Sequence, residues 1–207
     1  MGLFVKFFNQ TRKPEGFLGK LMVGFMNGGH AKLADWGLSA LDGIKASNMA
    51  ELGCGGGRNA RELLKLYPEA QLTALDYSEV SIEKTMKTNR KSIEAGRCRV
   101  VQGDVSSLPF DAEAFDLATA FETVYFWPDL RKCFTEVCRV LKPGASFLIC
   151  NESDGTDEAT LKYTKIIDGM NCYTQDQLAD ALAASGFSEI KTRHHPVMPW
   201  ITVLAGK

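Results

Sequence analysis

The segment from Glu51 to Gly57 combines a carboxylate with a cluster of glycines, in the order Glu-Leu-Gly-Cys-Gly-Gly-Gly. Glycine accepts positive φ and lets a ligand approach the backbone with no Cβ in the way. A helix that starts behind such a turn offers free N–H groups to a bound group. A dinucleotide fingerprint, G-x-G-x-x-G, would need glycine at position 58, where Arg58 stands. Because Glu51 would also repel a pyrophosphate, the segment favours a ligand that carries an ammonium and a sulfonium.

A second group of candidate residues follows the apolar run 115–121. Glu122 and Tyr125 lie in a stretch rich in aromatic residues, which suits a flat or cationic ligand. Local core packing explains the same aromatic residues equally well. His30 begins a helical segment and can act as a base near neutral pH, although a capping or surface histidine is the simpler interpretation.

Composition and charge exclude several classes of protein. Of 207 residues, 24 are Lys or Arg and 25 are Asp or Glu, a balance that does not suit a domain binding a nucleic-acid duplex. No run approaches the ~18 consecutive apolar residues of a membrane span. The six cysteines include no C-x-x-C pair and only three histidines occur, so we expect reduced thiols and no metal site. These features predict a cytoplasmic protein with no nucleic-acid partner and no stable membrane insertion.

Apolar runs alternate with helical periodicity from residue 47 onward. Ala60, Leu63 and Tyr67 fall on one helical face after the glycine cluster, and similar faces recur later in the chain. Alternation of this kind predicts a parallel sheet with helices on both faces. The short connection before the last run favours an antiparallel final pair. The expected strands are 48–52, 71–76, 99–102, 115–121, 145–150, 187–192 and 197–205.

Two segments stand outside this alternation. Residues 1–44 form an expected N-terminal helical cap around Trp36, and residues 152–172 form an insert in which Thr156 can begin a helix. Either segment can cover a site at the strand ends or complete the core. We therefore expect an α/β fold with one doubly wound, mostly parallel seven-stranded sheet over residues 45–207, an antiparallel last strand and the cap before it.

The ordered motifs resemble those of class I S-adenosylmethionine-dependent methyltransferases. Glu51 to Gly57 is similar to the family's first motif, Asp76 to its acidic residue after the second strand, and Gly103-Asp104-Val105 to its third signature. The resemblance covers roughly residues 45–205 and is closest to the ubiquinone/menaquinone-biosynthesis-like, type 11 subgroup. It implies a Rossmann-like fold, S-adenosylmethionine as methyl donor, S-adenosylhomocysteine as product, and no metal.

The resemblance also implies roles for individual residues. Asp76 would accept hydrogen bonds from both ribose hydroxyls, because a carboxylate offers two acceptor oxygens. Asp104 would accept a hydrogen bond from the adenine amino group, and Glu51 would lie near the methionyl ammonium. The expected cofactor-binding residues are Glu51, Gly53, Cys54, Gly55, Gly57, Asp76, Tyr77, Gly103, Asp104, Val105 and Ala120.

Methyl transfer depends on alignment and exclusion of water rather than on one obligatory side chain. The sequence therefore identifies neither the acceptor nor a catalytic residue, and His30, Glu122 and Tyr125 are candidates for the acceptor pocket. The expected acceptor is a small molecule methylated at O, N or C by a monomer or homodimer. A non-catalytic S-adenosylmethionine-binding regulatory protein and an aminopropyl transferase remain alternatives. We expect residues 1–29 to form a mobile cover, with His30 and Trp36 near the mouth of the pocket.

Overall fold

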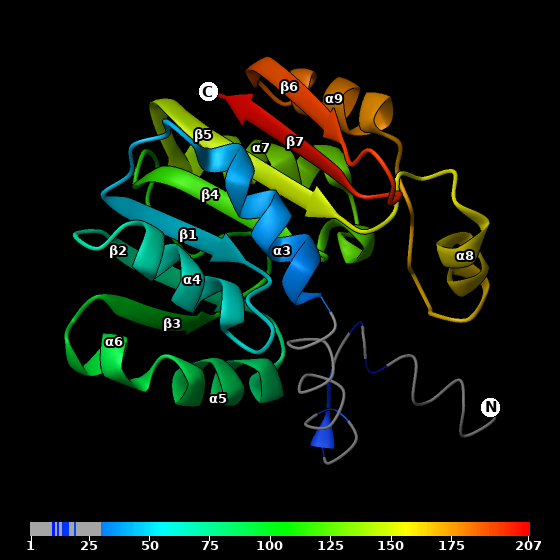
Figure 1. Ribbon diagram of the computed structural model, residues 1–207. Coiled ribbons are helices and arrows are strands. Elements are labelled where there is room, and N and C mark those ends of the chain that lie inside the picture. The colour runs from blue at the N-terminus through cyan, green and yellow to red at the C-terminus, as the bar shows by residue number, and fades with distance from the viewer. Residues whose placement is uncertain (1–9, 11, 13, 17–18, 20–29) are drawn as a thin grey trace.

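In this computed structural model of the chain, the described residues are 10, 12, 14–16, 19 and 30–207. They form a seven-stranded sheet in the order β3-β2-β1-β4-β5-β7-β6, in which β7 runs antiparallel to both its neighbours (Figure 1). The strand order reverses between β1 and β4, which confirms the predicted doubly wound fold class. The strands are β1 (Asn48–Leu52), β2 (Gln71–Asp76), β3 (Cys98–Gln102), β4 (Phe115–Phe121), β5 (Leu141–Asn151), β6 (Ser188–His194) and β7 (Ile201–Gly206).

Helices cover both faces of this sheet. α3 (Ala31–Leu38) and α4 (Arg58–Leu66) pack on one face, and α7 (Leu130–Val140) and α9 (Gln175–Ala183) pack on the other (Figure 1). β5 is buried on both faces, as a central strand covered by helices should be. A Cβ at Gly37 of α3 would lie only 2.5 Å from the Cys150 sulfur of β5. The helix predicted around Trp36 is therefore packed directly against the sheet.

Two helix starts follow the predicted caps. Ser78 is the N-cap of α5 (Glu79–Thr88), where its hydroxyl accepts a hydrogen bond from the N–H of Ser81. Thr174 and Gln177 form the predicted capping box at the start of α9. The remaining helix between β2 and β3 is α6 (Arg90–Glu94). No helix in the described part of the chain has the length and apolar character that a membrane span requires.

The insert 152–172 is less helical than its pattern predicts. It holds α8 (Glu158–Leu161) and a short 3-10 turn, η4 (Lys162–Lys165). The prediction that Thr156 begins the helix is wrong, because its hydroxyl and N–H both donate to the Asp154 carboxylate. Asp157 is the N-cap instead and accepts a hydrogen bond from the N–H of Thr160 at 2.8 Å.

Two strands begin four residues away from their predicted starts, and the other boundaries agree to within two residues. β5 begins at Leu141 rather than residue 145, because Leu141 pairs with Phe115 of β4 before an irregularity in the register. β7 begins at Ile201 rather than residue 197, and Val197 is 85% exposed in the turn that precedes it. The apolar character of Val197 and Met198 predicted that they belong to the strand. The flanking Pro196 and Pro199 keep this turn out of the hydrogen-bonded ladder of the sheet, because proline has no N–H to donate.

Candidate functional site

The glycine turn between β1 and α4 has a backbone that only glycine adopts readily. Gly53, Gly55 and Gly57 have φ values of 83°, 52° and 76°. A Cβ at Gly53 would lie 2.3 Å from the Thr123 hydroxyl oxygen, so the turn packs closely against the end of β4. A Cβ at Gly55 would meet no atom of the described residues within 4 Å. The backbone at Gly55 therefore faces open space and is accessible to a ligand.

Asp76, at the carboxyl end of β2, lies beside this turn. Its Oδ2 accepts a hydrogen bond from the N–H of Gly55, and its Oδ1 accepts one from the N–H of Ser78, both at 2.9 Å. Burial raises the pKa of its carboxyl, and these backbone hydrogen bonds oppose the rise. Each carboxylate oxygen can accept a further hydrogen bond. Asp76 can therefore bind two hydroxyl groups of one ligand.

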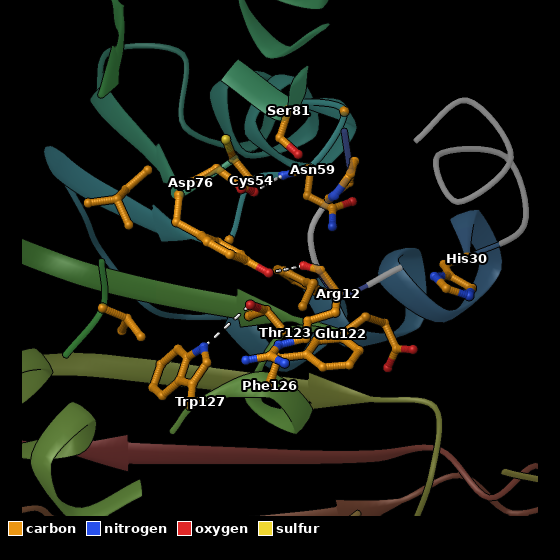
Figure 2. Close-up of a pocket in the computed structure, with 18 of the residues that line it drawn as sticks. Arg12, His30, Cys54, Asn59, Asp76, Ser81, Glu122, Thr123, Phe126 and Trp127 are labelled. Carbon is orange, nitrogen blue, oxygen red and sulfur yellow. Dashed lines mark hydrogen bonds between the residues drawn. The ribbon is translucent and has the colours of Figure 1, made fainter. Parts of the chain in front are cut away.

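The turn, Asp76 and the ends of β3 and β4 surround a cavity of about 340 Å³ (Figure 2). The fold brings most of the predicted cofactor residues to its wall although they come from three separate strand ends. The predicted residues that line it are Gly53, Cys54, Gly55, Asp76, Tyr77, Gly103, Asp104 and Val105.

The other three predicted cofactor residues do not line the cavity. Glu51 is buried in β1, and its Oε2 has no hydrogen-bond partner among the described residues. Burial and the nearby charge of Asp76 raise the pKa of the Glu51 carboxyl. A Cβ at Gly57 would lie 2.6 Å from the Asn89 amide nitrogen, and Ala120 is fully buried in the core. The contacts of these three residues with a cofactor stay predictions.

Two described residues of the N-terminal segment, Arg12 and Pro14, also line the cavity. Their carbonyl groups accept hydrogen bonds from the hydroxyls of Tyr77 and Ser78, both at the carboxyl end of β2. Most of the cover expected over residues 1–29 lies outside the described residues, so its mobility stays a prediction. Trp36, expected near the mouth, is not among the lining residues.

α5 presents a polar face to the glycine turn, a feature that the sequence analysis missed. The side chains of Thr85, Thr88 and Asn89 donate hydrogen bonds of 2.8–3.0 Å to carbonyls of the turn. Met86, which an apolar pattern directs inward, is 50% exposed instead. The recurrence of Ser81, Thr85 and Asn89 every four residues was the available signal, because a buried polar stripe can satisfy the carbonyls of a tight turn.

Glu122 marks the opposite side of the cavity, where β4 ends. It has a φ of 58°, which is uncommon for a residue other than glycine. Its Oε1 accepts hydrogen bonds from the hydroxyl of Tyr125, at 3.1 Å, and from the N–H of Glu152. Burial and the charge of Glu152 raise the pKa of Glu122 to about 8. The Nε2 of His30 lies 3.6 Å from Oε2 of Glu152. The fold thus gathers His30, Glu122 and Tyr125, whose proximity the sequence does not show.

The aromatic run after β4 divides between the cavity and the core. Phe126 and Trp127 line the cavity, but Tyr125 does not. Tyr125 is 3% exposed, and its hydroxyl accepts a hydrogen bond from the N–H of Ser153 at 2.9 Å. Trp127 also stacks on Phe147 of the core, with 6.2 Å between ring centroids. Tyr125 therefore supports Glu122 from behind rather than forming the cavity wall.

Sequence comparison identifies the domain that carries this cavity. The family described as a methyltransferase domain matches residues 50–149, from β1 to β5. This part of the chain, just under half of its length, is similar to a methyltransferase domain. The match includes the glycine turn, Asp76, Asp104 and Glu122, whereas the lining residues Arg12, Pro14 and His30 lie before it.

The chain also matches parts of curated proteins. A cycloartenol-C-24-methyltransferase of Oryza sativa subsp. japonica is 34% identical over 108 residues, which are 52% of this chain and 31% of that protein. A sterol 24-C-methyltransferase of Gibberella zeae is 28% identical over an alignment of 179 residues that covers 80% of this chain and 46% of that protein. The chain therefore spans less than half the length of these relatives.

Solved structures share the fold of the chain. A SAM-dependent methyltransferase from Aquifex aeolicus superposes with a TM-score of 0.73 at 16% identity, covering 90% of this chain and 97% of that chain. Human N-acetylserotonin methyltransferase, solved in complex with SAM, superposes with a TM-score of 0.76 at 19% identity, covering 92% of this chain and 56% of that chain. At such identities the likeness establishes the fold.

Proposed function

We propose that the protein transfers a methyl group from S-adenosylmethionine to a small-molecule acceptor. The observation that carries this proposal is the open space at Gly55 beside the Asp76 carboxylate, where the strand order reverses. Ligands of doubly wound sheets bind at this reversal, outside the carboxyl ends of the strands. The methyltransferase domain match and the relatives named for methyl transfer support the same reaction over aminopropyl transfer.

The chemistry of the cavity wall fits this donor. Gly55 leaves a cradle that a Cβ would fill, and Asp76 offers acceptor oxygens for the two ribose hydroxyls. Asp104 and Val105, after β3, line the same cavity, which supports the roles of accepting a hydrogen bond from the adenine amino group and donating one to the adenine ring. The buried Glu51 oxygen, which has no hydrogen-bond partner among the described residues, suits a nearby ammonium group.

The remaining wall has the character of an acceptor site. S-adenosylmethionine supplies a methyl group already activated on a sulfonium, so the protein's task is to align the acceptor and exclude water. Phe126 and Trp127 add apolar surface, while His30 and Glu122 add polar groups on the side away from Asp76 (Figure 2). The relatives named for sterol methylation are more than twice as long as the matched region, so we leave the acceptor at the level of a small molecule.

Calorimetric titration of the full chain tests the donor. We expect saturable binding of S-adenosylhomocysteine at one site and no comparable binding of NADH, because Arg58 replaces a glycine of the dinucleotide fingerprint. Saturable NADH binding without S-adenosylhomocysteine binding would contradict the proposal. Transfer of labelled methyl groups from S-adenosylmethionine to small molecules of a cell extract distinguishes the enzyme from a non-catalytic binding protein.

A further inference from the structure

Three potential metal ligands meet at the side of the cavity away from Asp76. They are His30 at the N-cap of α3, Glu122 after β4 and Glu152 after β5. One ligand atom from each lies within 4.8 Å of the other two. Figure 2 shows His30 and Glu122 on one side of the cavity and Asp76 on the other. The residues are far apart in sequence, so a search for short ligand spacings does not find them.

The charges of this cluster suit a cation. Glu122 and Glu152 place two carboxylates side by side, and in the described part of the chain the one ion pair made by either is that of Glu152 with His30. No Lys or Arg among the described residues forms an ion pair with either carboxylate. A divalent ion would relieve the repulsion between the two carboxylates, and a neutral imidazole completes a nitrogen and oxygen ligand set.

The ligand atoms are also held in place for binding. The His30 side chain makes no capping hydrogen bond to α3, so its ring is not committed to the helix. The Tyr125 hydroxyl and the Glu152 N–H hold one oxygen of Glu122, in the way that outer partners orient metal ligands. Both His30 and Glu122 line the 340 Å³ cavity, so an ion between them is accessible to a small molecule.

We propose that His30, Glu122 and Glu152 bind one divalent transition-metal ion, of the Mn²⁺, Fe²⁺ or Zn²⁺ type, at the acceptor side of the cavity. Three protein ligands leave coordination positions for water or for oxygen atoms of a substrate. If methyl transfer is the reaction, such an ion would favour an acceptor with hydroxyl or carboxylate oxygens and would lower the pKa of a bound hydroxyl. The binding site itself does not depend on that reaction.

Electron paramagnetic resonance of Mn²⁺, added to chelator-treated full-length protein without S-adenosylmethionine, tests the site. We expect one Mn²⁺ per chain in the wild type. Glu122→Gln, Glu152→Gln and His30→Ala should each weaken binding by about tenfold or more, since loss of an outer partner alone costs about that much. Glu69→Gln removes an exposed carboxylate elsewhere and should bind Mn²⁺ like the wild type.

Circular dichroism and urea unfolding of the same variants show that they fold. Absence of Mn²⁺ binding by the wild type would overturn the site, and so would unchanged affinity in any of the three ligand variants. S-adenosylhomocysteine is titrated without metal. Loss of the metal site and failure of the proposed donor are therefore separate results.

Discussion

Two aspartates at opposite ends of the same sheet have opposite pKa shifts. Asp76 lies at the carboxyl end of β2, where burial raises the pKa of its carboxyl. Asp116 lies at the amino end of β4, where it accepts hydrogen bonds from Ser47, Asn48 and Lys142. Burial opposes ionisation there too, but these bonds outweigh it and hold the pKa of Asp116 below its usual range. The amino end supplies its carboxylate with internal donors, and the carboxyl end leaves acceptor capacity for a ligand.

Two glycines, one at each end of the sheet, show the same contrast between a ligand site and a structural position. Gly55 and Gly144 both have positive φ, and in the described part of the chain a Cβ at either would meet no atom within 4 Å. Gly144 belongs to β5 near its amino end, where its N–H donates to the Lys207 carbonyl. A side chain at either position carries a similar backbone strain of about 1–2 kcal/mol. Only the side chain at Gly55 would enter the cavity.

The largest expected effect comes from this matched pair of glycines. Gly55→Val should weaken S-adenosylhomocysteine binding by about two orders of magnitude or more, which is about 2.7 kcal/mol, because the branched side chain occupies the space of the ligand. Gly144→Val should bind within a few-fold of the wild type. Calorimetry measures both affinities, and circular dichroism checks both folds. Normal binding by a folded Gly55→Val variant would remove the turn from the site.

A smaller effect is expected at Asp116, on stability rather than binding. Asp116→Asn should lower the free energy of unfolding by about 2 kcal/mol at pH 7, because a carboxylate with several donors is lost. Since the folded pKa of Asp116 is lowered, its contribution is present above the unfolded pKa of about 3.9 and is lost as the pH falls through the folded value. The difference between wild type and variant should narrow by about 1 kcal/mol between pH 7 and pH 3.

Urea unfolding at both pH values measures this narrowing. Asp111→Asn is the control, because Asp111 is exposed near the same end of the sheet. If the difference in free energy of unfolding between wild type and Asp116→Asn is larger at pH 3 than at pH 7, these hydrogen bonds do not stabilise the Asp116 carboxylate. Reduced affinity of Asp116→Asn for S-adenosylhomocysteine would contradict the view that the amino end of the sheet serves stability and the carboxyl end serves ligand binding.

The sequence predicts the carboxyl-end site well wherever the signal is local. The glycine turn and Asp76 lie within one strand–turn–helix unit and its neighbour, and their spacing fixes where they meet. The polar face of α5 was missed because Thr85 and Asn89 are buried by hydrogen bonds to turn carbonyls, against the apolar pattern. The approach of His30 to Glu152 was also not predictable, because the packing of α3 on the sheet creates it.

Titration of Asp76→Ala with S-adenosylhomocysteine tests most directly whether the carboxyl-end cavity holds the methyl donor. Removing a carboxylate that accepts from two ribose hydroxyls should cost about 2–3 kcal/mol of binding free energy. Asp180→Ala, which removes an exposed carboxylate from α9, should bind like the wild type. A large loss in Asp76→Ala alone is the expected result. Equal affinities of Asp76→Ala and wild type would contradict the assignment of this cavity to S-adenosylmethionine.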